Sequence, residues 1–266
     1  MNALTLNGFN GSPYIGQPEN LSQWIDAAAA AGFAYYTPDC PAISAWLEAG
    51  RNLPALAQQF REAGIGCAVI SVAAMLDGSA QQDRDLAFSK AAGEALGAQF
   101  LQVNVGAPDK PSQLAALERA CDTLTRTGLK LALEYMPISP LATLADTVEL
   151  VDAVGHDKAG ALVDIWHHNH DPQGWETLST VPLSAIAYAE FDDALPPLGS
   201  DLIEEMLHRR TMPGEGVLDC ARFAHILRDR GYDGLVSVEI INREWRERPI
   251  TDFTRACHDT TRAYFP

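Results

Sequence analysis

The chain has 266 residues with 35 acidic and 19 basic side chains, and therefore a formal net charge of −16. Proteins that bind nucleic acid need Lys and Arg to displace phosphate counterions, so this charge argues against that class and, more weakly, against binding to an anionic membrane surface. The composition, 47% hydrophobic and 20% charged, is typical of a folded globular protein rather than a disordered one.

The first residues lack the basic start and apolar core of a signal peptide, and no run of about 20 apolar residues predicts a membrane span. The five cysteines lie far apart and include no CxxC pair, which argues against a disulfide framework or a structural zinc site. We therefore expect a cytoplasmic protein with free thiols and no membrane partner.

Eight short apolar runs alternate with longer amphipathic segments along the chain. The runs predict strands at 4–6, 34–37, 67–72, 100–105, 130–135, 160–164, 185–191 and 235–240. The segments predict helices at 20–31, 42–63 (with a break near Pro54), 81–96, 112–126, 141–154, 173–180, 219–230 and 252–263. A further short helix is expected at 201–208, inside the long irregular stretch that precedes the last strand.

This alternation of strands and helices predicts a parallel sheet in an α/β fold. The strands are almost continuously apolar, as strands buried on both faces are. Eight units of about 33 residues each fit a (β/α)8 TIM barrel, which typically has roughly 250 residues. We predict one such domain over residues 1–266. A doubly wound open sheet is the alternative, because alternation alone does not close a barrel.

In a TIM barrel the catalytic groups come from the carboxyl ends of the strands. Four successive predicted strands, the fifth to the eighth, each carry one acid near that end: Glu134, Asp164, Glu190 and Glu239. Four converging acids would repel one another unless a cation lay among them or several were protonated. Oxygen ligands suit Mn²⁺, Mg²⁺ or Co²⁺ better than zinc, so the set predicts a divalent metal site. An acid of this kind taken alone is more often a helix cap or an ion-pair partner than a metal ligand.

Other polar residues stand close to these acids in the predicted barrel. Asn7 ends the first strand and is a candidate for binding substrate. His167 follows Asp164 by three residues, and its ring is able to hydrogen-bond a substrate carbonyl or hydroxyl. We expect His168 and His170, in contrast, to lie in solvent.

Two further features predict contacts with a substrate. Arg209 and Arg210 precede a PGEG turn, and one of them is expected to bind a carboxylate, phosphate or hydroxyl group while the other is solvated. Trp166 is a candidate wall of the pocket, although it would equally well cap the barrel core. The chain lacks the GxxxxGK[ST], GxGxxG, HExxH and GxSxG motifs, so nucleotide binding and serine hydrolysis have no support.

Taken together, these segments resemble the xylose-isomerase-like TIM barrels of the sugar phosphate isomerase/epimerase superfamily. The motifs that carry the resemblance are LEYMP at 133–137, VDIWH at 163–167, FDDA at 191–194, RRTMPGEGVLD at 209–219 and GYDGLVSVEI at 231–240. The resemblance spans nearly the whole chain and is strongest between residues 130 and 241.

The resemblance implies a divalent metal ion, most often Mn²⁺ and otherwise Mg²⁺ or Co²⁺. It places the ligands at Glu134, Asp164, Glu190 and Glu239. It also implies that His167 and Arg210 bind substrate, and that Glu134 and Glu239 act as the acid/base pair. Position 190 departs from the family pattern, which usually has His or Gln there, so Glu190 makes the site more anionic and either binds the ion or stays beside it.

The activity implied by this resemblance is isomerisation or epimerisation of a small polyhydroxy carbonyl compound, with proton transfer through an enediolate that the metal stabilises. A dehydratase of the inosose or dehydroshikimate type is an alternative, because the same intermediate is able to expel a hydroxyl group. A non-catalytic barrel that serves as a subunit or binding module is a third hypothesis. Barrels of this family often form homo-oligomers, but nothing in this chain fixes an oligomeric state.

Overall fold

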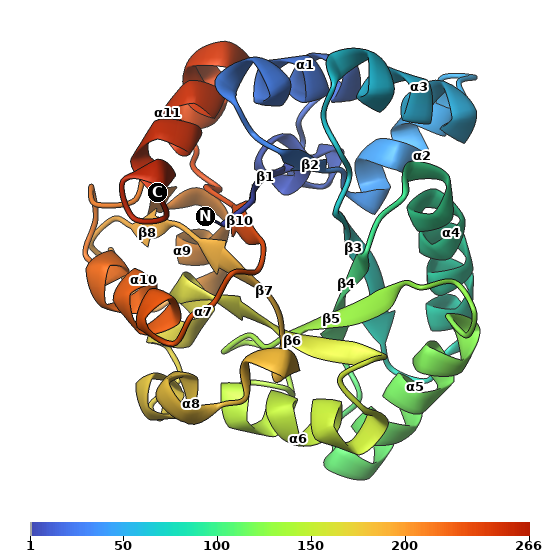
Figure 1. Ribbon diagram of the computed structural model, residues 1–266, viewed down its shortest axis with the longest axis vertical. Helices are drawn as coiled ribbons and strands as arrows, with labels where there is room; N and C mark the ends of the chain where they lie inside the picture. The colour runs from blue at the N-terminus through green and yellow to red at the C-terminus, as the bar shows by residue number, and fades with distance from the viewer. Residues whose placement is uncertain (1) are drawn as a thin grey trace.

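Eight parallel strands form a ring at the centre of the protein in the computed structural model, which describes residues 2–266 (Figure 1). The strands are β1 (Leu4–Asn7), β2 (Tyr35–Thr37), β3 (Val69–Leu76), β4 (Phe100–Val105), β5 (Lys130–Glu134), β6 (Ala159–Asp164), β7 (Ile186–Phe191) and β10 (Val236–Val238). Their order is β2-β1-β10-β7-β6-β5-β4-β3. Isolated parallel pairs, Tyr35 with Gly66 and Asp39 with Ser71, join the two ends of this order. The predicted TIM barrel is therefore confirmed.

Helices surround the ring of strands (Figure 1). They are α1 (Leu21–Ala31), α2 (Cys40–Glu48), α3 (Leu53–Ala63), α4 (Ala80–Leu96), α5 (Lys110–Thr123), α6 (Leu144–Val154), α7 (Ile165–Asn169), α8 (Gly174–Thr180), α9 (Leu202–His208), α10 (Cys220–Asp229) and α11 (Ile250–Arg262). The first and last of the large helices, α1 and α11, pack side by side where the ring begins and ends. None of the helices in residues 2–266 is both long and apolar enough to cross a membrane.

The segment predicted as one helix over 42–63 forms two helices, α2 and α3. Asn52 begins α3, because its side chain accepts the amide N–H of Ala55 at 2.9 Å. Pro54 lies in the first turn of α3, where its missing N–H costs no intrahelical hydrogen bond. The expected break therefore lies at residues 49–52, just before the proline rather than at it.

Strand β3 differs most from its prediction of 67–72, because it runs on to Leu76. Its register against β4 is irregular between Ile70 and Ala74. Val72 lies inside this irregular stretch with φ of +51°, a left-handed value that a β-branched residue rarely adopts. This irregular stretch borders the mouth of the barrel, where Val72 lines a cavity.

The strands divide the interior of the protein into two layers. In β5, Leu131 and Leu133 belong to the large core that packs between the ring and the helices, whereas Ala132 belongs to a small separate cluster. Side chains alternate between the faces of a strand, so Ala132 and Glu134 share the face that points to the barrel axis. The axis is thus filled by apolar side chains near the amino ends of the strands and by polar ones near the carboxyl ends.

Gly160 of β6 provides a test of how closely the strands of the ring approach. A Cβ atom at this position would lie 2.8 Å from the backbone nitrogen of Ala187 on the neighbouring strand. We expect Gly160→Ala to lower the free energy of unfolding by about 1–3 kcal/mol, because a rigid backbone must shift. Gly199→Ala is the matched control, since a Cβ there meets no atom within 4 Å. Urea denaturation that gives equal midpoints for the two variants would contradict this packing.

Candidate metal centre

The parallel strands bring the four predicted acids to the same end of the barrel. Asp164 of β6 pairs with Glu190 of β7, Glu190 pairs with Ser237 of β10, and Glu134 of β5 pairs with Asn104 of β4. Glu239 follows the last residue of β10. All four carboxylates are buried, with exposed fractions of 8% or less.

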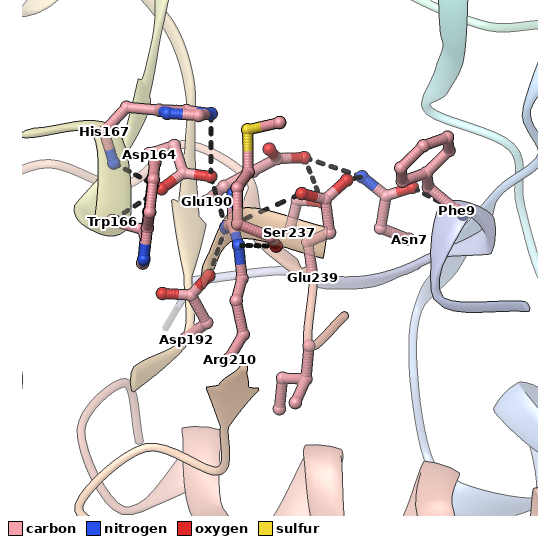
Figure 2. Close-up of polar contacts among 12 residues, drawn as sticks. Asn7, Phe9, Asp164, Trp166, His167, Glu190, Asp192, Arg210, Ser237 and Glu239 are labelled. Atoms are coloured by element: carbon pink, nitrogen blue, oxygen red, sulfur yellow. Dashed lines mark hydrogen bonds and ion pairs between the residues drawn. The ribbon is translucent and has the colours of Figure 1, made fainter. Parts of the chain in front are cut away.

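The carboxylates form one connected cluster, of which Figure 2 shows Asp164, Glu190 and Glu239. Asp164, Glu190 and Glu239 each offer an oxygen within 4.8 Å of the others, and the same holds for Glu134, Asp164 and the ring of His167. Asp164 belongs to both groups and therefore links them. Carboxylate oxygens supplied by several strands around one point are the donor set that a hard divalent cation requires.

Glu190 and Glu239 are both held by Asn7 (Figure 2). The Asn7 amide nitrogen donates hydrogen bonds to Glu190 Oε1 at 2.8 Å and to Glu239 Oε1 at 3.0 Å. Ser237 Oγ donates a further bond to Glu190 Oε1 at 2.9 Å. The Asn7 side-chain oxygen Oδ1 in turn accepts the backbone N–H of Phe9 at 3.0 Å, which fixes the orientation of the side-chain amide. Asn7 thus positions two carboxylates, and it does not line the cavity described below.

Glu134 is held from the opposite side of the site by two amides of β4. Gln102 Nε2 and Asn104 Nδ2 donate to Glu134 Oε2 at 2.6 and 2.7 Å. The other oxygen, Oε1, lies 3.3 Å from His167 Nε2. One oxygen of Glu134 is therefore anchored, while the other faces His167.

Asp164 both begins helix α7 and binds Arg210. Its Oδ1 accepts the backbone N–H groups of Trp166 and His167 at 2.6 and 3.1 Å, and its Oδ2 accepts Arg210 Nη1 at 2.6 Å. Arg210 also bonds to Asp192 and lies 3.6 Å from Glu239 Oε2 (Figure 2). Only 1% of Arg210 is exposed, so its charge acts on these acids with little screening by water.

The charges of the cluster are unbalanced within the protein itself. Burial raises the pKa of Glu190 well above its usual value, and the charges of Glu239, Glu134 and Asp164 raise it further. Burial also raises the pKa of Glu239 to about 8, although Arg210 opposes this shift. For Asp164 the effect of burial is overcome by Arg210 and His167, which leave the pKa below its usual value. A divalent cation fits this site, because it would neutralise acids that the single guanidinium leaves unpaired.

A cavity of about 310 Å³ opens above the cluster at the carboxyl ends of the strands. Glu134, His167, Arg210 and Glu239 line it, whereas Asp164 and Glu190 lie behind them. Trp166 does not line the cavity: it is 2% exposed, and its ring lies under Arg210, whose guanidinium carbon is 5.4 Å from the ring centroid. In this conformation Trp166 therefore supports Arg210 rather than walling the pocket.

The prediction that His168 lies in solvent is wrong. Asp164 caps a short helix where a loop was expected, and the turn of that helix directs His168 into the core. Its Nδ1 lies 3.1 Å from the Tyr135 hydroxyl, and its ring meets the ring of Trp175 edge-on. Burial lowers the pKa of His168 to about 4, so the ring is neutral at pH 7. His170 is only half-buried, and its Nδ1 lies 2.8 Å from the Trp166 carbonyl oxygen.

Three residues of the site were not identified from the sequence. Gln102 lies two residues before Asn104, and Ser237 lies two residues before Glu239. Side chains alternate between the two faces of a strand, so the members of each pair lie on the same face. That signal was available once the strands were assigned. Asp192 lies in the FDDA motif, but nothing in the sequence distinguishes its buried contact with Arg210 from a solvated acid.

The fold and this acidic centre define a TIM barrel with a candidate cation site at the carboxyl ends of its strands. A comparison with models of known protein families shows to which family the chain belongs. The model of the xylose isomerase-like TIM barrel family matches residues 25–257, and the chain belongs to that family.

Curated relatives are similar over part of their length. An inosose isomerase of Halalkalibacterium halodurans is 30% identical over 137 residues, which cover 50% of this chain and 47% of the relative. A 3-dehydroshikimate dehydratase of Pseudomonas putida is 31% identical over 100 residues, which cover 38% of this chain and 16% of the relative. The matched region thus spans about half, or less, of these relatives.

A crystal structure of the IOLI protein with a binding zinc atom superimposes on this chain with a TM-score of 0.87. The superposition covers 98% of this chain and 97% of the other, at 19% sequence identity. A likeness at this identity establishes the shared fold.

Metal binding is predicted to release protons at pH 7. Glu239, with a pKa of about 8, must lose a proton to bind a cation at pH 7, and the raised pKa of Glu190 favours release of a proton from that residue as well. We expect roughly one or two protons per Mn²⁺ ion, and an affinity that rises with pH up to about 8. Calorimetric titrations in buffers of different ionisation enthalpy measure this release. Glu190→Gln should release fewer protons, and a wild-type protein that releases none would contradict the proposed charge imbalance.

Proposed function

We propose that this protein is an isomerase or epimerase that uses a divalent metal ion, Mn²⁺ first of all, to act on a small polyhydroxy carbonyl compound. The observation that carries this proposal is the placement of Glu134 and Glu239 on different strands with both side chains facing one cavity. Asp164 and Glu190 lie behind them, and Asp164 belongs both to the group of donors that includes Glu134 and to the group that includes Glu190 and Glu239. Two carboxylates on either side of one substrate suit removal and return of a proton.

Glu134, Asp164, Glu190 and Glu239 would hold the ion. When bound, a divalent cation polarises the substrate carbonyl and offsets the negative charge that develops on its oxygen. One glutamate of the pair Glu134 and Glu239 takes the proton from the carbon beside the carbonyl, which gives an enediolate. The other glutamate, in its protonated form, delivers its proton to the opposite face of the same carbon, or to the former carbonyl carbon while the hydroxyl proton passes to the carbonyl oxygen. The first glutamate is left protonated and the second ionised.

Two groups at the floor of the cavity are suited to orient the substrate. His167 Nε2 lies beside Glu134 Oε1, so a hydroxyl bound there is within reach of both groups. Arg210 is fixed by Asp164 and Asp192, and it offers its remaining N–H groups to a substrate oxygen. The similarity to an inosose isomerase supports isomerisation of a cyclic or open-chain polyol ketone.

A dehydratase is the second candidate function, and the similarity to a 3-dehydroshikimate dehydratase supports it. The two reactions share the first proton abstraction and differ in the next step. An isomerase returns the proton, whereas a dehydratase expels a hydroxyl group from the adjacent carbon and leaves an enone. The product of an inosose therefore separates them, because an enone has an ultraviolet absorbance that the isomer lacks.

Exchange of the substrate proton with solvent tests the proposal. The Mn²⁺-loaded protein is incubated with an inosose in D₂O, and loss of the proton beside the carbonyl is followed by NMR. We expect exchange that EDTA abolishes and that Glu134→Gln or Glu239→Gln slows by roughly 10²–10⁴-fold. Glu118→Gln, on the exposed face of α5, is the control and should exchange like the wild type. Equal rates in all three variants, or full exchange in EDTA, would reject the mechanism.

A further inference from the structure

The cavity above the acidic cluster is polar at its floor and apolar at its rim. The floor consists of the groups described above. The rim carries four large apolar side chains, Tyr14, Met75, Ile138 and Ile203, whose exposed fractions lie between 44% and 66%. They come from four separate segments: the 3-10 helix Pro13–Ile15, the end of β3, the loop after β5, and α9.

Most of the exposed large apolar side chains of the described residues lie at this one opening. Six large apolar side chains are exposed within residues 2–266, and four of them stand at this mouth, while Leu198 and Val217 lie elsewhere. Single exposed apolar residues need no explanation, but a contiguous patch beside a polar pocket indicates a ligand or partner surface. Because the rim and the floor line one cavity, a ligand that is bound at the floor and extends toward the opening contacts the rim.

The charges of the cavity restrict the ligand further. Arg210 is the only Lys or Arg that lines it among the described residues, and Arg210 is already paired with Asp164 and Asp192. Glu134 and Glu239 line the same space. A phosphate or carboxylate at the far end of a substrate would therefore meet apolar side chains and negative charge, with no free cation to bind it.

Resting on the proposed function, we propose that the substrate is an uncharged polyhydroxy ketone whose end remote from the carbonyl is apolar. Its hydroxy-carbonyl end lies at the floor between Glu134 and Glu239, and its other end contacts Tyr14, Met75 and Ile203 at the rim. A cavity of about 310 Å³ is of the size that holds a small molecule of this kind. Phosphate esters of the same skeleton are excluded by the missing cation.

Three five-carbon probes test this assignment, because they share the HOCH₂–CO end and differ only in the remainder. They are 1-hydroxypentan-2-one with an alkyl end, ribulose with a hydroxylated end, and ribulose 5-phosphate with a charged end. Dissociation constants are measured by calorimetry on the Mn²⁺-loaded protein and corrected for the open-chain fraction of each probe. We expect the alkyl ketone to bind at least tenfold more tightly than ribulose, and ribulose more tightly than its phosphate.

A variant of the rim separates its role from that of the floor. Ile203→Lys places a cation on the exposed face of α9, so it should weaken binding of the alkyl ketone and strengthen binding of ribulose 5-phosphate, each by several-fold. Leu198→Lys is the matched control, because Leu198 is 80% exposed and does not line the cavity. It should leave all three dissociation constants unchanged.

The outcomes distinguish this inference from the proposed function. If ribulose or its phosphate binds as tightly as the alkyl ketone, or if the alkyl ketone does not bind at millimolar concentration, the inference is overturned whether or not solvent exchange occurs. If the expected order holds but none of the probes exchanges its proton, the ligand class stands and the proposed reaction fails. If Ile203→Lys alters only the oligomeric state in sedimentation, the rim is a contact between copies of the chain and the inference is again overturned.

Discussion

The burial of five carboxylates, three of which face the single arginine Arg210, is the constraint on which the rest of this structure depends. Ionised acids this deep in a protein are stable only when paired, and Arg210 lies within hydrogen-bond distance of Asp164 and Asp192 but leaves Glu190 without a basic partner. The neutral donors Asn7, Ser237, Gln102 and Asn104 orient the acids without neutralising them. Such an arrangement is costly for stability alone, and it is what a site prepared for a cation requires.

The barrel supplies the geometry that makes this burial useful. Parallel strands in fixed register bring residues that lie far apart in the sequence to one level, and alternation points them to one axis. The short helix α7 begins on the site itself, because Asp164 caps it and thereby fixes His167 one turn later. Local structure and chemistry are thus coupled: a change at Asp164 would affect the acid cluster, the start of α7 and the orientation of Arg210 together.

Much of this arrangement could be predicted from the sequence, because strands and helices alternate with a regular period and the acids stand at strand ends. The eight strands and the closed barrel are confirmed, and the four acids do converge. The rest depends on tertiary contacts. The bulge at Val72 follows from pairing with β4, and the burial of His168 follows from a helix too short to give a periodic signal. The positions of Asn7 and Trp166 behind the cavity likewise depend on packing that no local pattern records.

The most direct test of the account is thermal unfolding of the EDTA-treated protein with and without Mn²⁺. If the four carboxylates hold the ion, Mn²⁺ at 100 times its dissociation constant should stabilise the wild type by about 2.7 kcal/mol, a rise of several degrees in Tm. Glu239→Gln should remove most of that rise, whereas the exposed Glu118→Gln should retain it. A wild-type protein whose Tm does not respond to Mn²⁺, Mg²⁺, Co²⁺ or Zn²⁺ would contradict the central claim that this acidic cluster is a metal site.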